Sequence, residues 1–303
     1  MTLLDDRPPA EEVVEKASPE LERKAERAES WRGFFHALPA YVYLIAFFAL
    51  PLVIVFVFSF ASRSITGRPL LTDWNLDSYA KLIEPIVRTI AARSLWLAVL
   101  NTVICLVIGY PFAYWIATRS RGSTRNLLLL LVLIPFWSNF LVRTYAWRVL
   151  LGANGPVTSI GEATGLWGQM LFTQPAVFIG LLYGYLPFMV LPLYASIERL
   201  DWSLIEGARD LYASGWEAFR RVTLPLTRPG IVAGSILVFI PSLGAYVTPD
   251  ILGGAKTTLL GNYIVTQFTS GRNWPFGAAL SFVILAAMLI ATIFYFRSGG
   301  RTL

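Results

Sequence analysis

The chain has 303 residues, of which 55% are hydrophobic and 15% are charged. About a quarter of the residues in a soluble protein are normally charged, so the composition argues against a soluble enzyme or a nucleic-acid-binding domain. The net charge of +6 comes from Lys and Arg clusters between apolar runs, which is a topology signal rather than a phosphate-binding face. We therefore interpret the chain as a polytopic membrane protein that binds lipid and no nucleic acid.

The first 36 residues form a charged extension with nine acidic and six basic side chains. A secretory signal would have a basic head and a shorter apolar core, so we predict a cytoplasmic extension over residues 1–36. Ser18 followed by Pro19 is typical of a helix start. Part of this extension is therefore expected to be helical.

Uncharged runs along residues 37–303 predict an all-α domain with six membrane spans. A bilayer core about 30 Å thick takes about 20 helical residues, and the third run is counted as continuing past Arg143. Proline inside several runs is compatible with kinked helices in lipid. The expected spans are residues 37–62, 94–118, 126–150, 174–197, 229–249 and 275–296.

The distribution of positive charge predicts the orientation of the chain. Excess Lys and Arg in short loops stays on the cytoplasmic side. The second loop, the fourth loop (198–228) and the C-terminal tail are rich in Arg, the third loop has no Lys or Arg, and the fifth has only Lys256 and Arg272. The first loop also carries basic residues, but the other loops outweigh it, so both termini are expected inside.

Residues for catalysis or metal binding are scarce. The single histidine, His36, and the single cysteine, Cys105, argue against a zinc or haem site and exclude an internal disulfide. The string 253–258 is similar to a phosphate-binding loop, but Asp250 and Ala255 stand where that loop needs glycine. We predict no catalytic residue, no cofactor and no metal, and an energy source on another polypeptide.

The fourth loop is predicted to contain two short amphipathic helices. Ser203 and Glu206 have the spacing of a capping box, which would start the first helix. Leu204, Ala208 and Leu211 would share one apolar face of this helix. The second helix would carry the apolar face of Trp216, Phe219 and Val222 and end at Pro225. Such faces are covered either by lipid, as in an interfacial helix, or by a cytoplasmic partner.

This segment resembles the coupling loop of ABC-importer permeases, whose pattern is Glu-Ala-Ala, three residues, Gly, nine residues, Ile-x-Leu-Pro. Glu206 and Ala208 match it, and 222–225 reads Val-Thr-Leu-Pro in register. Gly207 replaces the middle Ala and Tyr212 replaces the Gly, so Gly215 is expected to supply the bend. The resemblance implies contact with an ATPase through Ser203, Glu206, Gly207, Ala208, Asp210, Gly215, Leu224 and Pro225.

A narrower resemblance to the spermidine/putrescine-type permeases rests on several motifs across residues 37–296. They are Arg-Thr-Tyr-Ala-Trp (143–147), Leu-Gly-Ala-Asn-Gly (151–155), Ser-Leu-Gly-Ala-Tyr-Val-Thr-Pro-Asp (242–250), Leu-Gly-Gly (252–254) and Asn-Trp-Pro-Phe-Gly-Ala-Ala (273–279). This resemblance implies six spans in a bacterial inner membrane, a second similar permease, two cytoplasmic ATPase subunits and a periplasmic binding protein. Permeases for opines, ferric iron and other small solutes share much of the pattern.

Two other classes of membrane protein fit the sequence less well. A secondary transporter would have coupling carboxylates or broken helices in the membrane, and the acids that border the spans are Glu162, Glu198 and Asp250. A membrane enzyme would have a polar catalytic cluster at one interface, and the sequence shows none.

For a polyamine, we predict a cation pathway lined by aromatic faces, which attract ammonium groups without trapping them. The candidates are Trp137, Tyr145, Trp147, Tyr185, Tyr246 and Asp250. Tyr183 is a further aromatic residue of this region, but it points away from Tyr185 on a helix. Aromatic residues also form interfacial belts in any membrane protein. Arg143 would repel a cation unless it pairs with Asp250 or Glu162.

The predicted outer loops are expected to contact the binding protein. Glycines punctuate them at Gly155 and at Gly253–Gly254, and Glu162, Asp250, Lys256 and Arg272 supply charge. Loops of this kind are otherwise solvated connectors.

Overall fold

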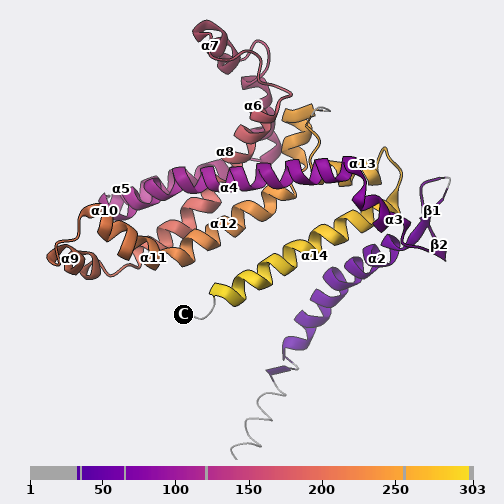
Figure 1. Ribbon diagram of the computed structural model, residues 1–303, viewed down its shortest axis with the longest axis horizontal. Helices are drawn as coiled ribbons and strands as arrows, with labels where there is room; N and C mark the ends of the chain where they lie inside the picture. The colour runs from indigo at the N-terminus through magenta and orange to yellow at the C-terminus, as the bar shows by residue number, and fades with distance from the viewer. Residues whose placement is uncertain (1–32, 35, 65, 120–121, 255–256, 300–303) are drawn as a thin grey trace, which may run out of the picture. The chain divides into compact units, whose positions relative to one another are not determined.

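The computed structural model describes residues 33–34, 36–64, 66–119, 122–254 and 257–299 (Figure 1). The predicted helix near Ser18, most of the N-terminal extension, Arg121 and Lys256 lie outside these ranges. The chain divides into two units, Met1–Val55 and Phe56–Leu303. The second unit contains the elements from β1 onward and all of the candidate site residues.

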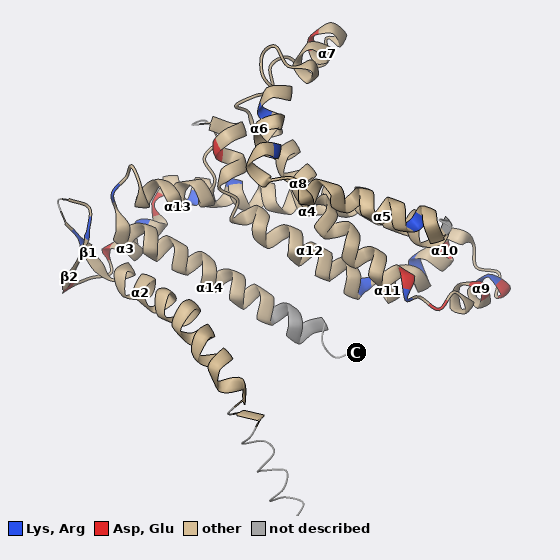
Figure 2. Cartoon of the chain, turned by 180° about the vertical axis from the view of Figure 1, so that it is seen from behind, with Lys and Arg blue, Asp and Glu red and all other residues tan. Residues whose placement is uncertain are grey.

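Four described helices are long and apolar enough to cross a membrane: His36–Ser59, Pro85–Thr118, Gln174–Glu198 and Trp274–Ile293. They belong to η1 (Ile45–Ala49) with α2 (Leu50–Ser59), α4 (Pro85–Arg119), α8 (Gln174–Glu198) and α14 (Trp274–Gly299). Two bent helix pairs raise the number of possible spans to six if each pair is one span. Figure 2 shows charged residues at the ends of the long helices and in the segment around α9 to α11, while most of α12 and α14 is tan.

Three predicted span boundaries differ from the structure. The first helix ends at Ser59, and a strand begins at Ala61. Helix α4 begins at Pro85 rather than residue 94, because proline fits the first turn of a helix. Helix α12 (Arg228–Leu243) ends before residue 249, since Gly244 follows it and residues 244–248 form a connection to η4 (Pro249–Gly253).

The third predicted span, 126–150, is not one straight helix. Helices α5 (Gly122–Trp137) and α6 (Phe140–Leu150) meet at a 90° bend. Asn139 causes the new start, because its side-chain oxygen accepts hydrogen bonds from Leu141 N (2.8 Å) and Val142 N (3.4 Å) as an N-cap. Pro135 also removes one backbone donor near the end of α5.

The structure contains one feature that the predicted all-α class does not include. It is a two-stranded antiparallel hairpin of β1 (Ala61–Arg63) and β2 (Pro69–Trp74). Its strands are too short and too irregular in pattern to stand out from the sequence. Short helical elements fill the other connections: α3 (Asp77–Ala80), η2 (Lys81–Ile83), α7 (Pro156–Thr164) and α13 (Leu260–Phe268).

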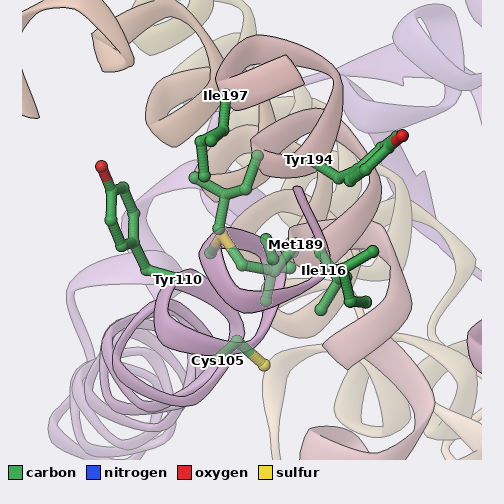
Figure 3. Packing of buried hydrophobic residues seen from close by; sticks show 10 residues of the cluster. Cys105, Tyr110, Ile116, Met189, Tyr194 and Ile197 are labelled. Atoms are coloured by element: carbon green, nitrogen blue, oxygen red, sulfur yellow. The ribbon is translucent and has the colours of Figure 1, made fainter. Parts of the chain in front are cut away.

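Helices α4, α8 and α12 pack against one another and form the main core (Figures 1 and 3). Cys105 and Ile116 of α4 and Met189 and Ile197 of α8 are fully buried there. Gly230 allows α12 to approach α8 closely, since a Cβ at this position would lie 2.4 Å from Ser196 Cβ and 2.7 Å from the Pro192 carbonyl oxygen. Small residues are what permit such close helix contacts in membranes.

A buried polar pair also joins two helices of this core. Asn101 of α4 donates a hydrogen bond from Nδ2 to Ser242 Oγ of α12 at 2.9 Å, and both side chains are buried. A polar side chain in an apolar interior is stable only when it is bonded. This pair therefore sets which faces of α4 and α12 meet.

Candidate functional site

The loop of residues 198–228 folds into a short helix, a turn and a second helical segment. They are α9 (Ser203–Asp210), followed by α10 (Gly215–Ala218), η3 (Phe219–Thr223) and α11 (Leu224–Leu226). This loop leads directly into α12 through a 64° bend. Any force on the loop is therefore applied at the end of a core helix.

Helix α9 is capped differently from the sequence prediction. The capping box of Ser203 and Glu206 is wrong, because Ser203 is already inside the helix. The N-cap is Trp202, whose side chain makes no capping bond, and Asp201 just before it accepts a hydrogen bond from Ser203 N at Oδ1, at 3.0 Å. Hydrogen bonds from the Ser203 hydroxyl and amide hold the pKa of the Asp201 carboxyl below its ordinary value. Glu206 is thereby left exposed and free of a capping role.

The apolar face predicted for α9 is open. Ile205 is the residue that packs inward, at 7% exposure, whereas Leu204 is 50% exposed and Leu211 is 83% exposed. Ala208 lies between them and is half-buried. A Cβ added at Gly207 would meet no atom within 4 Å, so the surface around it is unobstructed. Exposed apolar groups of this kind, rimmed by a carboxylate, are typical of a surface that contacts another protein.

The turn after α9 lies at Tyr212, not at Gly215. Tyr212 has a φ of +63° and its side chain is 97% exposed. It therefore adopts the left-handed conformation for which the coupling-loop pattern has glycine. Gly215 begins α10 with ordinary helical geometry, so the expectation that it supplies the bend is wrong.

Replacing Tyr212 with glycine is expected to stabilise the loop by about 1 kcal/mol, because glycine adopts positive φ without the Cβ clash. The side chain has no packing to lose in the isolated subunit. Thermal unfolding of the purified protein measures the change. The control is Ala213→Gly, two residues before Gly215, where φ is not positive. This substitution should lower the melting temperature. An equal change in melting temperature in both variants would contradict backbone strain at Tyr212.

Helix α10 carries the capping box of this loop. Ser214 N donates to Glu217 Oε2 at 2.9 Å, and Glu217 N donates to Ser214 Oγ at 3.2 Å. The backbone and hydroxyl of Ser214 hold the pKa of the Glu217 carboxyl below its ordinary value. A carboxylate at a helix N-terminus is further favoured by the backbone dipole.

The lowered pKa of Glu217 predicts an acid sensitivity of this helix. The ionised carboxylate is favoured in the folded state, so its stabilisation is complete above the unfolded pKa and is lost as pH falls through the lower folded pKa. We expect the melting temperature of the wild type to fall more steeply below about pH 4.5 than that of Glu217→Gln. Parallel pH profiles would show that the cap contributes nothing.

The second helical segment does not end at Pro225. It continues to Leu226, because Pro225 lies in the first turn of α11, where its missing amide breaks no helical bond. Trp216 is 67% exposed and stacks on Phe219 at a centroid distance of 5.5 Å. Leu224 packs against the main core. The loop thus has one anchored side and one exposed apolar side.

A hollow of about 330 Å³ lies at the other end of the core helices, lined by Phe140, Tyr185, Pro241 and residues 244–248. Tyr185 donates a hydrogen bond from its hydroxyl to the Pro241 carbonyl at 3.3 Å. Tyr246 is 42% exposed. Two of the six predicted pathway residues, Tyr185 and Tyr246, therefore line one space.

The structure places the other four pathway candidates elsewhere. Trp147 packs edge-on against Tyr183 at 5.4 Å, beside a buried cluster. Trp137 and Tyr145 are exposed, at 80% and 51%, and neither lines the hollow. Asp250 is exposed on η4 and its amide donates to Tyr246 O at 3.1 Å. Asp250 follows the lining residues 244–248 closely in sequence, but it does not line the hollow.

Arg143 contacts a backbone carbonyl and two aromatic rings, not Asp250 or Glu162, whose carboxylates could have offset its charge. Its guanidinium donates to the Pro135 carbonyl and lies over the rings of Phe140 and Tyr183, at 5.6 and 5.9 Å from their centroids. The charge is thus held by a carbonyl dipole and two aromatic faces. Phe140 also lines the hollow, so this cation lies on its border.

The residues proposed for contact with a binding protein lie on exposed elements. Glu162 is exposed on α7, which Pro156 begins after Gly155 as its N-cap. Arg272 is exposed and adopts a positive φ of 44°. Lys256 lies outside the described residues. Among the charges that the structure does describe, no geometric relation singles out one docking surface.

Sequence reasoning missed the polar and aromatic side chains that join the loop to the core. Thr227, at the bend before α12, is fully buried and bonds to Tyr110 of α4. The pairs Tyr110–Thr227 and Asn101–Ser242 connect residues more than 100 positions apart. The available signal was the presence of Asn and Tyr inside apolar runs, where polar groups need a partner.

Comparison with known proteins gives consistent likenesses. Residues 109–301 match the family described as "Binding-protein-dependent transport system inner membrane component". The chain is 41% identical over 259 residues to the spermidine/putrescine transport system permease protein PotB of Salmonella typhimurium, covering 84% of this chain and 90% of that protein. The corresponding protein of Escherichia coli K12 is 40% identical over 84% and 94% of the two chains.

Two solved structures share the fold. A bacterial ABC transporter involved in the import of the acidic polysaccharide alginate matches with a TM-score of 0.69 and 17% identity, over 93% of this chain and 99% of that one. The bacterial alginate transporter in complex with an alginate pentasaccharide-bound periplasmic protein matches with a TM-score of 0.68 and 16% identity, over 89% and 94% of the chains. At this level of identity the likeness shows the fold.

Proposed function

Because this chain belongs to the binding-protein-dependent transport system inner membrane components, we propose that it carries polyamines such as spermidine and putrescine through the membrane as the permease subunit of an ATP-driven importer. The solute is inferred from the 40–41% identity to relatives named for spermidine/putrescine transport. The helical membrane permease fold predicted from the sequence is confirmed by the family and by the solved structures. The role is a transport role, with ATP hydrolysed by partner subunits.

The proposed assembly contains a second, homologous permease, two cytoplasmic ATP-binding subunits and a periplasmic solute-binding protein. The open apolar face of α9, with Leu204 and Leu211 exposed beside Glu206, supports a protein partner on the loop 198–228. Arginines are frequent in this loop, which supports its cytoplasmic position and that of both termini in the bacterial inner membrane.

The test is uptake of radiolabelled spermidine by membranes that contain the complete transporter and its binding protein. Uptake should require ATP and be inhibited by excess putrescine. Uptake of an opine or of ferric iron with no uptake of either polyamine would assign the same permease role to another solute. Spermidine uptake that persists without the ATPase and follows an ion gradient would instead indicate a secondary transporter.

Within this function, we expect the hollow beside Tyr185 and Tyr246 to guide the cation. Its aromatic rings can each stabilise an ammonium group by about 0.5–2 kcal/mol, and Asp250 lies four residues after Tyr246 with its backbone bonded to it. The neighbouring Arg143 has its charge held by Pro135 and by two rings, which lessens its repulsion of the solute.

Tyr246→Ala is expected to raise the KM for spermidine about 2–10-fold, since one cation–π contact is lost. Asp250→Asn should raise it as well, by removing the nearby negative charge. The matched control is Tyr145→Ala, an exposed tyrosine that does not line the hollow. The pathway is elsewhere if Tyr246→Ala and Asp250→Asn transport normally, or if Tyr145→Ala has the larger effect.

A further inference from the structure

The bend between the cytoplasmic loop and α12 is held by a buried hydrogen bond. Thr227 stands at the 64° bend and is fully buried. Its Oγ1 lies 2.9 Å from the Thr223 carbonyl, 3.2 Å from the Leu224 carbonyl and 2.9 Å from the Tyr110 hydroxyl. A hydroxyl has one proton to donate, and carbonyl oxygens only accept. Thr227 therefore donates to the preceding turn, and Tyr110 donates to Thr227.

The same face of α4 also packs against the loop through aromatic side chains. Tyr110 meets Phe219 edge-on at 5.6 Å, and Tyr114 meets Phe219 at 6.3 Å. Tyr114 also contacts Trp202, which precedes α9, at 6.3 Å. Tyr110 and Tyr114 are four residues apart and so lie on one side of the helix. Both ends of the loop are thus attached to α4, which precedes it by about 100 residues in sequence.

Phe219 lies in an irregular part of the loop. It begins η3, a π-helical turn between α10 and α11. Single π turns inside helices are frequent at functional sites, and the described residues contain two others, η1 and η4. Figure 3 shows Tyr110 at the edge of the packed cluster, with its hydroxyl pointing away from Met189 and Ile116. The phenol hydroxyl is therefore placed to bond to Thr227 at the bend rather than to pack in the core.

We propose that Tyr110 is a positioning residue that couples the loop 198–228 to α4, by donating to Thr227 at the bend and packing on Phe219. This inference rests on the proposed transport function, in which the loop meets the ATPase. Movement of the loop then displaces α4 together with α12, rather than changing only the angle at the bend. The Tyr110–Thr227 pair therefore acts as a joint between the loop 198–228, which meets the ATPase, and the membrane helices.

The chain contains a matched control for this joint. The hydrogen bond between Asn101 and Ser242 also connects α4 to α12, is also buried and has the same length of 2.9 Å. It lies away from the bend and touches no residue of the loop. Loss of either bond weakens the contact between the two helices, but only loss of the Tyr110 bond removes a hydrogen bond between α4 and the loop, leaving the ring contacts with Phe219 and Trp202 in place.

The experiment uses the complete transporter with its ATPase and binding protein in proteoliposomes. Tyr110→Phe keeps the ring and removes the hydroxyl, Thr227→Val removes the acceptor, Thr227→Ser restores it, and Ser242→Ala is the control. We expect Tyr110→Phe and Thr227→Val to lower the solute transported per ATP hydrolysed about 2–10-fold, with no further loss in the double variant. Thr227→Ser and Ser242→Ala should keep the wild-type ratio.

Hydrogen exchange gives a second measurement that does not depend on the solute. ATP binding should change amide protection in both residues 198–228 and α4 of the wild type, and the change in α4 should be smaller in Tyr110→Phe, which keeps the ring contacts. The proposal is overturned if α4 responds equally in both proteins, or if Ser242→Ala uncouples as strongly as Tyr110→Phe. Absence of spermidine uptake by the wild type, with these exchange differences present, would refute the proposed solute and leave the joint supported.

Discussion

Ala208→Glu is expected to abolish ATP-driven uptake while leaving the permease folded and in the membrane. The new carboxylate would stand between Leu204 and Leu211, in the middle of the exposed apolar face of α9. Burying an unpaired charge against an apolar partner surface costs several kcal/mol, which corresponds to a loss of binding of more than about 100-fold. Co-purification of the ATPase and uptake should be lost together.

The control for this prediction is Arg209→Glu. It adds the same carboxylate to the same helix, but about 100° around its axis from Ala208. ATPase retention in this variant, with loss in Ala208→Glu, would identify the apolar face as the contact. If Ala208→Glu still retains the ATPase and transports the solute, the assignment of the loop 198–228 to coupling is wrong.

The second large effect is expected at the contact between α12 and α8. Gly230→Ala should destabilise the protein by about 1–3 kcal/mol, because the added methyl group overlaps the Ser196 side chain and the Pro192 carbonyl. The neighbouring Gly234 is in similar contact with Met189, so the two helices have no free space into which to shift. Thermal unfolding in detergent and the amount of folded protein in membranes measure the change.

Gly184→Ala is the matched control in α8. A Cβ at Gly184 meets no atom within 4 Å, so the same substitution should instead stabilise the helix by up to about 1 kcal/mol. Opposite signs in the two variants identify close packing as the cause. A loss of stability in Gly184→Ala as large as that in Gly230→Ala would show that glycine at 230 is needed for another reason.

For four of the six expected spans, the apolar runs of the sequence correspond to helices long and apolar enough to cross a membrane. Helix α8 covers Gln174–Glu198 and α14 begins at Trp274, close to the expected ranges of 174–197 and 275–296. Hydrophobicity over about 20 residues is a local property, so it can be read without knowing the fold. The spacing of Glu206, Ala208 and residues 222–225, together with the other motifs, was likewise enough to predict the family, which the comparison confirms.

Only the tertiary structure decided how these helices break, turn and meet. The hydrogen bond of Asp201 rather than Ser203 at the start of α9, and the turn at Tyr212 rather than Gly215, depend on backbone angles that the sequence does not distinguish. The 90° bend at Asn139 depends on one side-chain oxygen. The bond between Tyr110 and Thr227 spans 117 positions, and a single sequence carries no local signal for it, because its energy exists only once α4 and α12 are packed together.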